Sequence, residues 1–445
     1  MRTLLSGWGR YPSGISEVHR PERLGELNVP LHSCESSIAR GLGRSYGDAS
    51  FNSTGCTVLT QRLNRFLGFD PSTGALECEA GVTIAEILEH FIPRGFLPPV
   101  IPGTKFVTVG GALACDVHGK NHHKDGSFGR YVIDFSLLTA DGELVRCSRD
   151  ENVELFQATV GGMGLTGIIT QLRLRLIPIE DPRVRVDFDR AEDLDRALEL
   201  FHASDERYKY SVAWIDCVGG GKRRLGRSVL MRGNPATGSD ATVLRPERRR
   251  AISIPGTTPS FLLNRVSIRA FNALYYRKHP RQARDVLCGY ESFFFPLDGI
   301  RDWNRLYGKN GFLQYQVVLP YEGGRDGLVK ILELLRKSGP GAFLAVLKRF
   351  GPGEPEAPLS FPMPGYTLAV DIPRRGPAVL ELLRGLDEIV IDHRGRVYLA
   401  KDARLSAEAA RAMYPDLEKW LQIKSRFDPA NRLTSDLARR LRLVP

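Results

Sequence analysis

Residues 39–48 read ARGLGRSYGD and place three glycines, Gly41, Gly43 and Gly47, within a few positions of one another. Glycine adopts backbone conformations that other residues avoid, so successive glycines let a loop turn its N–H groups towards one point. Such a loop can bind an anion. Glycine is also the commonest turn residue, so the stretch predicts either a phosphate-binding loop or a plain structural turn.

Two further glycine clusters follow. Pro102-Gly103-Thr104 precedes Thr108-Val109-Gly110-Gly111, and GMGLTG (162–167) matches the dinucleotide fingerprint G-x-G-x-x-G. A Rossmann fingerprint must follow a strand and open a helix. Here ENVELFQATV (151–160) before it is typical of a helix, and IITQLRLRL (168–176) after it alternates like a strand. The reversed order excludes a Rossmann NAD-binding unit and favours another way of cradling a pyrophosphate cofactor.

The sequence around these clusters is rich in short strands. CTVLT (56–60) and ALECEAG (75–81) predict strands, and IAEILEHFIPRG (84–95) predicts a helix that Thr83 caps. Pro178 and Pro182 indicate a domain boundary.

Regular patterning returns in the second half of the chain. FLQYQVVLP (312–320), FLAVLKRFG (343–351) and YTLAVDIP (366–373) predict strands, with helices over 327–339 and 378–390. Short connections favour antiparallel pairing, so this part predicts an antiparallel sheet covered by helices. VYLAKD (397–402) predicts a last strand, and two helices are expected from there to Leu443.

Composition narrows the protein class. The 445 residues are 42% hydrophobic and 25% charged, as in soluble globular proteins of two to three domains. No apolar run reaches the ~18 residues of a spanning helix, and the run in MRTLLSGWGRYP is too short for a secretion signal. The seven cysteines form no CxxC pair, so we expect reduced thiols rather than a disulfide framework.

The positive charge is concentrated in one segment. The net charge is +11, and residues 220–285 contain 15 Lys or Arg against 3 Asp or Glu, which gives +12 there and −1 elsewhere. Such a segment indicates an anionic partner, namely nucleic acid, an anionic membrane or a phosphorylated substrate. The alternative is a solvated arginine-rich loop.

Several motifs together resemble the decaprenylphosphoryl-β-D-ribose 2′-oxidase family, a branch of the vanillyl-alcohol-oxidase-type FAD enzymes. They are ARGLGRSYGD (39–48), VIPGT (100–104), TVGGALACDVHGKNHH (108–123), GGMGLTGIIT (161–170), FLQYQ (312–316) and AKD (400–402). The resemblance runs from about Gly7 to FDPANRLTSDLARRL (427–441) and is weakest over 218–285.

The resemblance implies an α+β fold with a two-part FAD-binding domain, residues 1–182 and 396–445. An antiparallel-sheet substrate domain covered by helices, residues 183–395, would be inserted between them and would carry the basic segment 220–285. FAD is expected to be held non-covalently. Its pyrophosphate loop would comprise Ala39, Arg40, Gly41, Leu42, Gly43, Arg44, Ser45, Tyr46, Gly47, Asp48 and Ala49. The flavin would be lined by Gly103, Thr108, Val109, Gly110, Gly111, Cys115, His118, Ile169 and Tyr398.

Three histidines, His118, His122 and His123, can be interpreted in two ways. Imidazole is a common metal ligand, but no zinc-type spacing of Cys, Asp or a second His pair completes the set. We therefore expect no metal. The alternative has His118 facing the flavin and the substrate.

The strand over 312–320 carries the candidate substrate contacts. Gln314 and Gln316 are two apart and share one face, while Tyr315 faces the opposite way. Lys348, among apolar neighbours, either reaches solvent or meets an anion. The resemblance implies that the substrate contacts Gln314, Tyr315, Gln316, Lys348, Thr367, Ala369 and Lys401.

The chain departs from the family at two of these positions. Ala369 replaces the cysteine that nitroaromatic inhibitors of the family capture, and Thr367 replaces an asparagine. The flavin performs the hydride chemistry, so catalysis is still expected, with changed substrate contacts.

Lys401, His118 and Tyr46 are the catalytic candidates. A desolvated lysine can have its pKa lowered enough to act as a base, and either Lys401 or His118 would assist loss of the hydroxyl proton. Tyr46 lies inside the glycine loop and could present its hydroxyl over the flavin.

The resemblance implies oxidation of the 2′-hydroxyl of a polyprenyl-phosphoryl-β-D-ribose to a 2′-keto sugar, the first half of an epimerisation to the arabinose donor of envelope glycans. It also implies a partner short-chain reductase, a quinone electron acceptor, and peripheral association with the anionic surface of the bacterial inner (plasma) membrane, on either face. One alternative is another FAD-linked sugar-alcohol or aldonolactone oxidase. A nucleic-acid-binding protein using 220–285 lacks any recognisable binding motif, so no nucleic-acid partner is expected.

Overall fold

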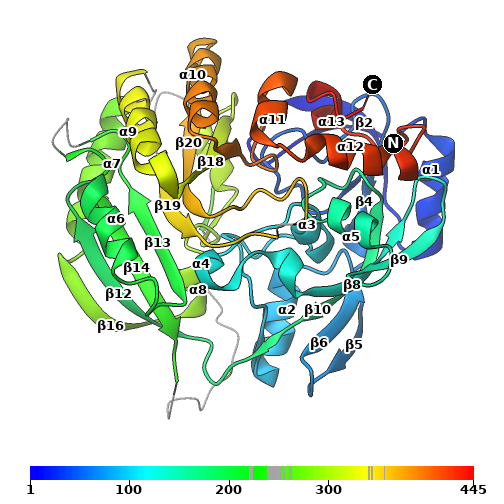
Figure 1. Ribbon diagram of the computed structural model, residues 1–445, viewed down its shortest axis with the longest axis horizontal. Coiled ribbons are helices and arrows are strands. Elements are labelled where there is room, and N and C mark those ends of the chain that lie inside the picture. The colour runs from blue at the N-terminus through cyan, green and yellow to red at the C-terminus, as the bar shows by residue number, and fades with distance from the viewer. Residues whose placement is uncertain are drawn as a thin grey trace.

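The computed structural model describes residues 1–219, 224–237, 244, 252–254, 256–259, 263–338, 341, 344–354 and 356–444. It is a mixed α/β structure in which two sheets of the N-terminal part lie beside one large antiparallel sheet (Figure 1). Within the described residues, no helix has the length and hydropathy needed to cross a membrane.

The first sheet leads into the glycine loop of residues 39–48. Its strands lie in the order β1 (Arg2–Ser6), β2 (Ser13–His19), β4 (Cys56–Leu59) and β3 (Ser37–Arg40). β4 runs parallel to both β2 and β3, and β1 is antiparallel to β2. Because β3 ends at Arg40, the glycine loop begins at the carboxyl end of a parallel strand, where ligands commonly bind.

The second sheet is antiparallel throughout. Its order is β5 (Phe66–Asp70), β6 (Ala75–Glu79), β10 (Ile168–Arg175), β8 (Val132–Leu138) and β9 (Leu144–Ser148). The strands predicted at 56–60, 75–81 and 168–176 are confirmed as β4, β6 and β10. Two further sheets have two strands each. One pairs β7 (Phe96–Leu97) with β11 (Ile177–Pro178), and the other pairs β15 (Ile252–Ser253) with β17 (Ile300–Arg301).

Short helices pack around these two sheets. They are α1 (Asn28–Ser33), α2 (Ile84–Phe91), α3 (Val109–Ala114) and α5 (Val153–Thr159). A further short helix, α4 (His122–Asp125), contacts β19 (Ala345–Phe350) of the large sheet described below. Thr83 caps α2 as predicted, and it forms a reciprocal capping box with Glu86. The helix α5 precedes the third glycine cluster and strand β10 follows it, which confirms the order opposite to a Rossmann unit.

The C-terminal helices return to the N-terminal part. In Figure 1 the red helices α11 (Ala407–Met413), α12 (Leu417–Phe427) and α13 (Asp436–Arg440) lie among the blue and cyan elements. The Trp420 indole N–H donates to the Ala158 carbonyl at 2.9 Å, and the Ser37 N–H donates to the Arg432 carbonyl at 2.6 Å. Three helices form where two were expected, because Pro415 and the turn around it separate α11 from α12.

The large sheet has eight strands, and every neighbouring pair is antiparallel. The order is β16 (Gln282–Cys288), β12 (Val184–Ala191), β14 (Ser228–Pro235), β13 (Tyr210–Ile215), β19 (Ala345–Phe350), β20 (Gly365–Pro373), β18 (Phe312–Pro320) and β21 (Arg396–Val397). The predicted antiparallel sheet is therefore confirmed. The strand predicted over 397–402 is shorter than expected, because the chain turns at Tyr398–Lys401.

Helices cover one face of this sheet. α6 (Leu194–His202) packs on β12 and β14, α9 (Tyr321–Ser338) packs on β18 and β20, and α10 (Ala378–Asp392) packs beside α9. Leu313, Val317 and Leu368 point into this helix-covered core. The remaining helices are α7 (Arg265–Lys278) and α8 (Tyr290–Phe294). The opposite face of the sheet borders the cavity described below.

The cysteines differ from the expectation. Cys34 and Cys56 form a disulfide, whereas Cys78, Cys147 and Cys217 are buried thiols as predicted. The prediction of reduced thiols was wrong for this pair because the fold, and not sequence spacing, brings them together. Cys34 follows α1 directly, and Cys56 is the first residue of β4.

Candidate active site

A cavity of about 720 Å³ lies between the glycine loops and the uncovered face of the eight-stranded sheet. Its volume is in the upper part of the range of small-molecule sites, roughly 300–1,000 Å³. Loop residues Gly41–Tyr46 line one end, and Gln314, Gln316 and Lys348 line another part. The residues that the sequence singled out in two distant regions therefore meet in one space.

The glycine loop offers unused backbone donors to the cavity. No hydrogen bond between described residues uses the backbone N–H of Leu42, Gly43, Arg44 or Ser45. The Arg44 Nε is buried and has no partner among the described residues, and its guanidinium lies 3.9 Å from the centre of the Trp8 ring. Successive N–H groups and a nearby guanidinium suit a pyrophosphate, so the loop fits the FAD that the resemblance implies.

Glycine is required where the loop packs against its neighbours. A Cβ on Gly41 would lie 2.3 Å from the Thr108 Oγ1, and one on Gly47 would lie 1.9 Å from the Asp402 carbonyl oxygen. Gly43 has a φ of +63°, in the left-handed region that favours glycine. These contacts hold the loop close to the start of α3 and to the segment that follows β21.

Most predicted cofactor residues line the cavity. From the loop these are Ala39, Gly41, Leu42, Gly43, Arg44, Ser45, Tyr46 and Ala49, and from elsewhere Gly103, Thr108, Gly110, Gly111, Cys115, His118, Ile169 and Tyr398. Met163, Gly164 and Gly167 of the third glycine cluster line it too. The cluster that matches a Rossmann fingerprint thus contributes to the same cavity in a different structural context.

Four predicted cofactor residues lie outside this lining and support it instead. The Arg40 guanidinium donates to the carbonyl of Ser6 at 2.7 Å, and Asp48 forms a buried ion pair with Arg440 at 2.7 Å. Gly47 packs against the Asp402 backbone, and Val109 is fully buried in the core of the N-terminal part. The sequence motif could not separate these residues from the lining ones, because both kinds occur in the same loop.

The uncovered face of the sheet carries the predicted substrate residues. Gln316 pairs with Ala369 across β18 and β20, and Lys348 pairs with Thr367 across β19 and β20, so all four share one face. Gln316, Ala369 and Lys348 line the cavity, and Thr367 lies behind them and accepts a hydrogen bond from the Gln316 amide at 3.2 Å.

Tyr315 does not belong to this group. Its side chain points to the helix-covered face, where its hydroxyl donates to the Asp387 carboxylate of α10 at 3.0 Å. The expected substrate contact of Tyr315 is therefore corrected, because alternate strand residues face opposite sides of a sheet.

His118 lies at the centre of a buried hydrogen-bond network. Its Nε2 is 2.8 Å from the Gln316 Nε2, and its Nδ1 is 3.1 Å from the Lys348 Nζ. The Gln316 amide N–H₂ also donates to the Thr367 Oγ1 at 3.2 Å, so both ring nitrogens of His118 lie within hydrogen-bonding distance of a side-chain nitrogen. Burial, together with Lys348, holds the pKa of His118 well below its usual value, so the ring is neutral at pH 7.

His122 is a neighbour of His118, with ring centroids 6.4 Å apart, and both rings pack on Phe350. The His123 Nε2 lies 3.0 Å from the Tyr208 carbonyl oxygen. Of the three histidines, only His118 lines the cavity.

Lys401 is held where the C-terminal segment meets the glycine loop. The Tyr398 N–H donates to the Gln316 carbonyl at 2.9 Å, and the Tyr46 N–H donates to the Ala400 carbonyl at 2.9 Å. The Lys401 Nζ lies 3.9 Å from the centre of the Tyr46 ring. Lys401, Tyr46 and Tyr398 are thus fixed together by backbone hydrogen bonds from the sheet and from the loop.

Burial lowers the pKa of three cavity lysines. The pKa falls to about 8 for Lys401 and to about 7 for Lys120. For Lys348 burial and the charges of Lys120 and Lys401 lower it to about 7. These amines can hold or release a proton near neutral pH, and in their charged form they attract an anion. Burial raises the pKa of Tyr46 well above its usual value, so its hydroxyl remains a donor.

The sequence reasoning missed Asp371 and Lys120. The Asp371 carboxylate accepts a hydrogen bond from the Gln314 amide at 2.5 Å, and burial raises its pKa to about 7. Asp371 lies two residues after Ala369 on the same strand face, so the alternation that paired Gln314 with Gln316 could have found it. Lys120 follows His118 by two residues in the quoted motif.

Comparison with protein families agrees with this site. Residues 33–148 match the FAD binding domain family, and residues 372–441 match the D-arabinono-1,4-lactone oxidase family. The first match contains the glycine loop and His118, and the second contains Lys401.

Individual relatives extend over the whole chain. The chain is 38% identical to the decaprenylphosphoryl-beta-D-ribose oxidase of Mycolicibacterium smegmatis, over 99% of this chain and 97% of that protein. It is 34% identical to an uncharacterised protein of Streptomyces coelicolor, over 81% of this chain and 100% of that protein. It is 23% identical to an alditol oxidase of a Streptomyces species, over 99% of each chain.

Proposed function

The chain belongs to the decaprenylphosphoryl-β-D-ribose oxidase family of FAD-dependent oxidoreductases, and we propose that it oxidises the 2′-hydroxyl of a polyprenyl-phosphoryl-β-D-ribose to the 2′-keto sugar. Residues 1–182 and 396–445 would form its two-part FAD-binding domain, and residues 183–395 its substrate domain. The ion pair between Asp48 and Arg440 supports this division, because it ties the glycine loop to the last helix.

One observation supports a phosphorylated substrate above all. Lys120, Lys348 and Lys401 line the same cavity as the amides of Gln314 and Gln316. Amides suit sugar hydroxyl groups, and lysine ammonium groups suit a phosphate. A neutral alditol or lactone would offer these lysines no anionic group.

The bound cofactor would supply hydride acceptance, while the protein holds the sugar and receives its hydroxyl proton. Lys401 or His118 would take that proton: the pKa of Lys401 is lowered to about 8, and His118 is neutral because its pKa is held far below the usual value. The hydrogen bonds from Gln316 and Lys348 would hold the His118 ring in place beside the substrate.

FAD is proposed to be bound without a covalent bond. The family resemblance supports this proposal, and in the structure both His118 ring nitrogens have side-chain partners, Gln316 and Lys348. The donors of the glycine loop would hold the pyrophosphate, with Gly103, Thr108 and Gly111 along the remainder of the cofactor.

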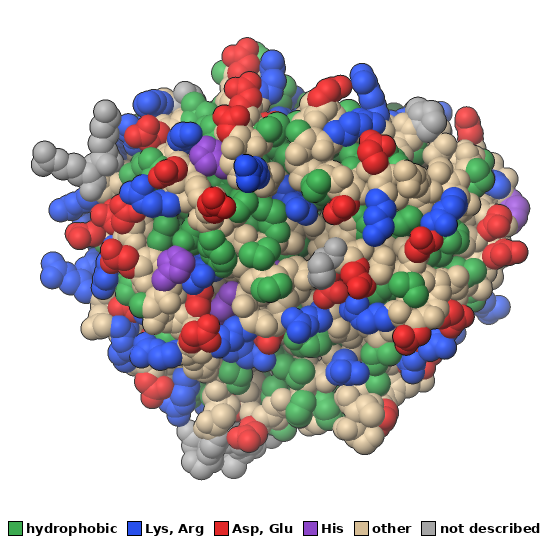
Figure 2. Space-filling model, in the orientation of Figure 1, with side chains coloured by type: hydrophobic (Ala, Val, Ile, Leu, Met, Phe, Trp, Pro, Cys, Tyr) green, Lys and Arg blue, Asp and Glu red, His purple; other side chains and the backbone are tan. Residues whose placement is uncertain are grey.

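The helix α7 supports peripheral association with an anionic membrane surface. Val266 and Leu274 are 77% and 68% exposed, and Arg269, Arg277 and Lys278 are exposed on the same helix. Phe271 and Tyr275 of α7 line the cavity, so a lipid tail that leaves the cavity would meet apolar side chains beside positive charges. Part of the basic segment 220–285, including 248–250, lies outside the described residues. The face in Figure 2 carries interspersed basic and acidic side chains and is a poor membrane surface.

The product would be a substrate for a partner short-chain reductase, which reduces the keto group to the arabinose configuration and so supplies the envelope glycan donor. A quinone at the bacterial inner membrane would be the electron acceptor. The family resemblance is the basis for both proposals. They agree with the chemistry of the reaction, because the reduced flavin must pass its electrons to an acceptor and reduction of the ketone needs a hydride donor.

A second candidate is an alditol or aldonolactone oxidase. The match of residues 372–441 to the D-arabinono-1,4-lactone oxidase family and the full-length alditol oxidase similarity favour it. Anaerobic bleaching of the flavin distinguishes the two. We expect polyprenyl-phosphoryl-ribose to bleach the holoenzyme and soluble alditols or aldonolactones to leave it yellow. Bleaching by the soluble sugars alone would favour the second candidate.

A further inference from the structure

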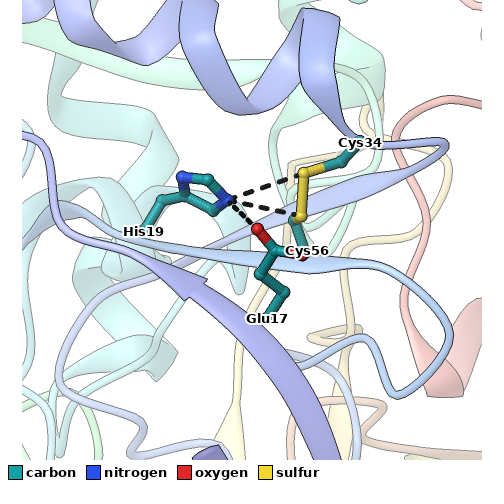
Figure 3. A group of neighbouring side chains, drawn as sticks. All are labelled: Glu17, His19, Cys34 and Cys56. Atoms are coloured by element: carbon teal, nitrogen blue, oxygen red, sulfur yellow. Dashed lines mark hydrogen bonds and ion pairs between the residues drawn. A yellow bond between two sulfur atoms is a disulfide. The ribbon is translucent and has the colours of Figure 1, made fainter. Parts of the chain in front are cut away.

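A second cluster of ligand-type side chains lies away from the cavity, at the N-terminal sheet. Glu17 and His19 project from β2, Cys56 begins β4, and Cys34 follows α1. Glu17 and Cys56 are direct partners in the parallel register of β2 and β4. Figure 3 shows the His19 ring directed at both sulfur atoms of the Cys34–Cys56 disulfide, with the Glu17 carboxylate beside it. None of the four residues lines the cavity.

The imidazole is the centre of the cluster. The His19 Nε2 lies 3.1 Å from the Glu17 Oε1, 3.6 Å from the Cys56 Sγ and 3.7 Å from the Cys34 Sγ. The four candidate ligand atoms all lie within 4.8 Å of one another. A disulfide needs neither an imidazole against both sulfurs nor a carboxylate beside them, so a crosslink alone does not account for the arrangement.

These separations are those of a tetrahedral zinc site. Zn–S bonds of about 2.3 Å and Zn–N or Zn–O bonds of about 2.0–2.1 Å separate nitrogen from sulfur by about 3.5 Å and nitrogen from oxygen by about 3.3 Å. The observed distances from His19 are close to both values. The two sulfurs must move apart, to about 3.8 Å, which requires the disulfide to be reduced, and the Glu17 carboxylate must approach to within about 3.5 Å of both sulfurs.

We propose that reduction of the Cys34–Cys56 disulfide turns this cluster into a Zn²⁺ site with Glu17, His19, Cys34 and Cys56 as ligands. A dithiol reductant supplies two electrons and two protons, which cleave the S–S bond to two thiols while the reductant becomes a disulfide. Zn²⁺ then displaces both thiol protons to solvent and binds two thiolates. A disulfide oxidant reverses the sequence and releases the ion, so the crosslink and the ion exclude each other.

The location of the site suggests a structural role, which is to anchor the segment that carries the glycine loop. Cys34 and Cys56 are 22 residues apart, and the segment between them contains β3 and the glycine loop. Either the disulfide or the ion would close this segment at its base. The segment that carries the glycine loop would therefore remain anchored under both oxidising and reducing conditions.

The test uses the full-length holoenzyme, before and after anaerobic treatment with a phosphine reductant. Each form is incubated with Zn²⁺, passed through a desalting column and analysed for metal per chain. We expect one Zn²⁺ per reduced chain and none in the oxidised chain. Co²⁺ should give the d–d bands of a tetrahedral thiolate site only after reduction. Alkylation followed by mass spectrometry should find Cys34 and Cys56 modified in the reduced protein and protected once Zn²⁺ is added.

The variant H19A should weaken Zn²⁺ binding at least tenfold, and E17Q should weaken it less. H32A is the matched control, because His32 is an exposed histidine on the neighbouring α1 and should have no effect. Zinc bound with the disulfide intact, zinc affinity unchanged in H19A, or a disulfide that resists the phosphine in the folded protein would each overturn the proposal. Both H19A and H32A retain the two cysteines, so the test does not depend on a variant that removes the crosslink.

Discussion

The Nε2 of Gln316 lies 2.8 Å from the Nε2 of His118, and this contact joins the large sheet to the N-terminal part of the chain. Gln316 belongs to β18, whereas His118 lies between α3 and α4. The other ring nitrogen of His118, Nδ1, lies 3.1 Å from the Lys348 Nζ. The contact therefore links the position of the large sheet to an imidazole that lines the cavity.

Gln316→Leu should slow flavin reduction. The change leaves the buried His118 Nε2 without its hydrogen-bonding partner and removes an amide from the cavity, whereas FAD content should be unchanged. Tyr315→Phe is the matched control on the other face of the same strand. It should lower the free energy of unfolding by about 0.5–1.5 kcal/mol through loss of the hydrogen bond to Asp387, with flavin reduction unchanged. Stopped-flow absorbance and denaturant titration measure the two effects, and slower reduction in Tyr315→Phe would contradict the assignment of the faces.

Lys401→Met should retain FAD and slow flavin reduction by substrate about 10²–10⁴-fold, the usual contribution of acid–base assistance. Methionine keeps most of the side-chain volume, and the backbone hydrogen bonds around Tyr398 and Ala400 do not use the lysine side chain. Combination with His118→Ala should cost less than the product of the single effects, because residues that act as one unit are not additive. A Lys401→Met enzyme that reacts at the wild-type rate would leave His118 as the base.

The rate of flavin reduction should rise with pH and level off above about 8. A base must be deprotonated to accept a proton, and the pKa of Lys401 is lowered to about 8, so the reactive fraction grows as pH rises through that value. The Asp371 charge raises the pKa of Lys401, so Asp371→Asn should move the midpoint to lower pH. A profile that is flat between pH 6 and 9, or that falls with pH, would show that Lys401 is not the base.

Gly41→Ala should reduce the FAD content of the purified protein. The added Cβ would lie 2.3 Å from the Thr108 Oγ1, so the loop must move away from the start of α3. Gly25→Ala is the control, because a Cβ there meets no atom within 4 Å. The ratio of flavin to protein absorbance measures the result, and equal ratios in both variants would refute a role for the close packing of the loop.

Local patterns predicted much of this fold. The alternation of 312–320 and 366–373 predicted β18 and β20, because each strand buries one face against helices. The capping of α2 by Thr83 was likewise readable, since a capping box depends on four adjacent residues. The motif resemblance then added the cofactor loop, whose residues line the cavity with few exceptions.

The sequence did not predict features that depend on contacts between residues far apart in the chain. The pairing of Cys34 with Cys56 arises where α1 ends beside β4, and no spacing rule indicates it. Burial behind Gln314 in the folded sheet raises the pKa of Asp371. Tyr315 was assigned to the substrate although its strand position already placed it on the opposite face. The resemblance identified a segment, but the alternation of the strand decides which of its side chains face the cavity.

Oxidation of the hydroxyl at the 2′ carbon can be tested by mixing the anaerobic holoenzyme with polyprenyl-phosphoryl-ribose and, separately, with its 2′-deoxy analogue, and by following the flavin absorbance. We expect rapid bleaching by the ribose compound and none by the analogue, which binds through the same phosphate and lipid but has no 2′-hydroxyl to oxidise. Bleaching by the 2′-deoxy analogue at a comparable rate would place the oxidation at another carbon and refute the proposed reaction.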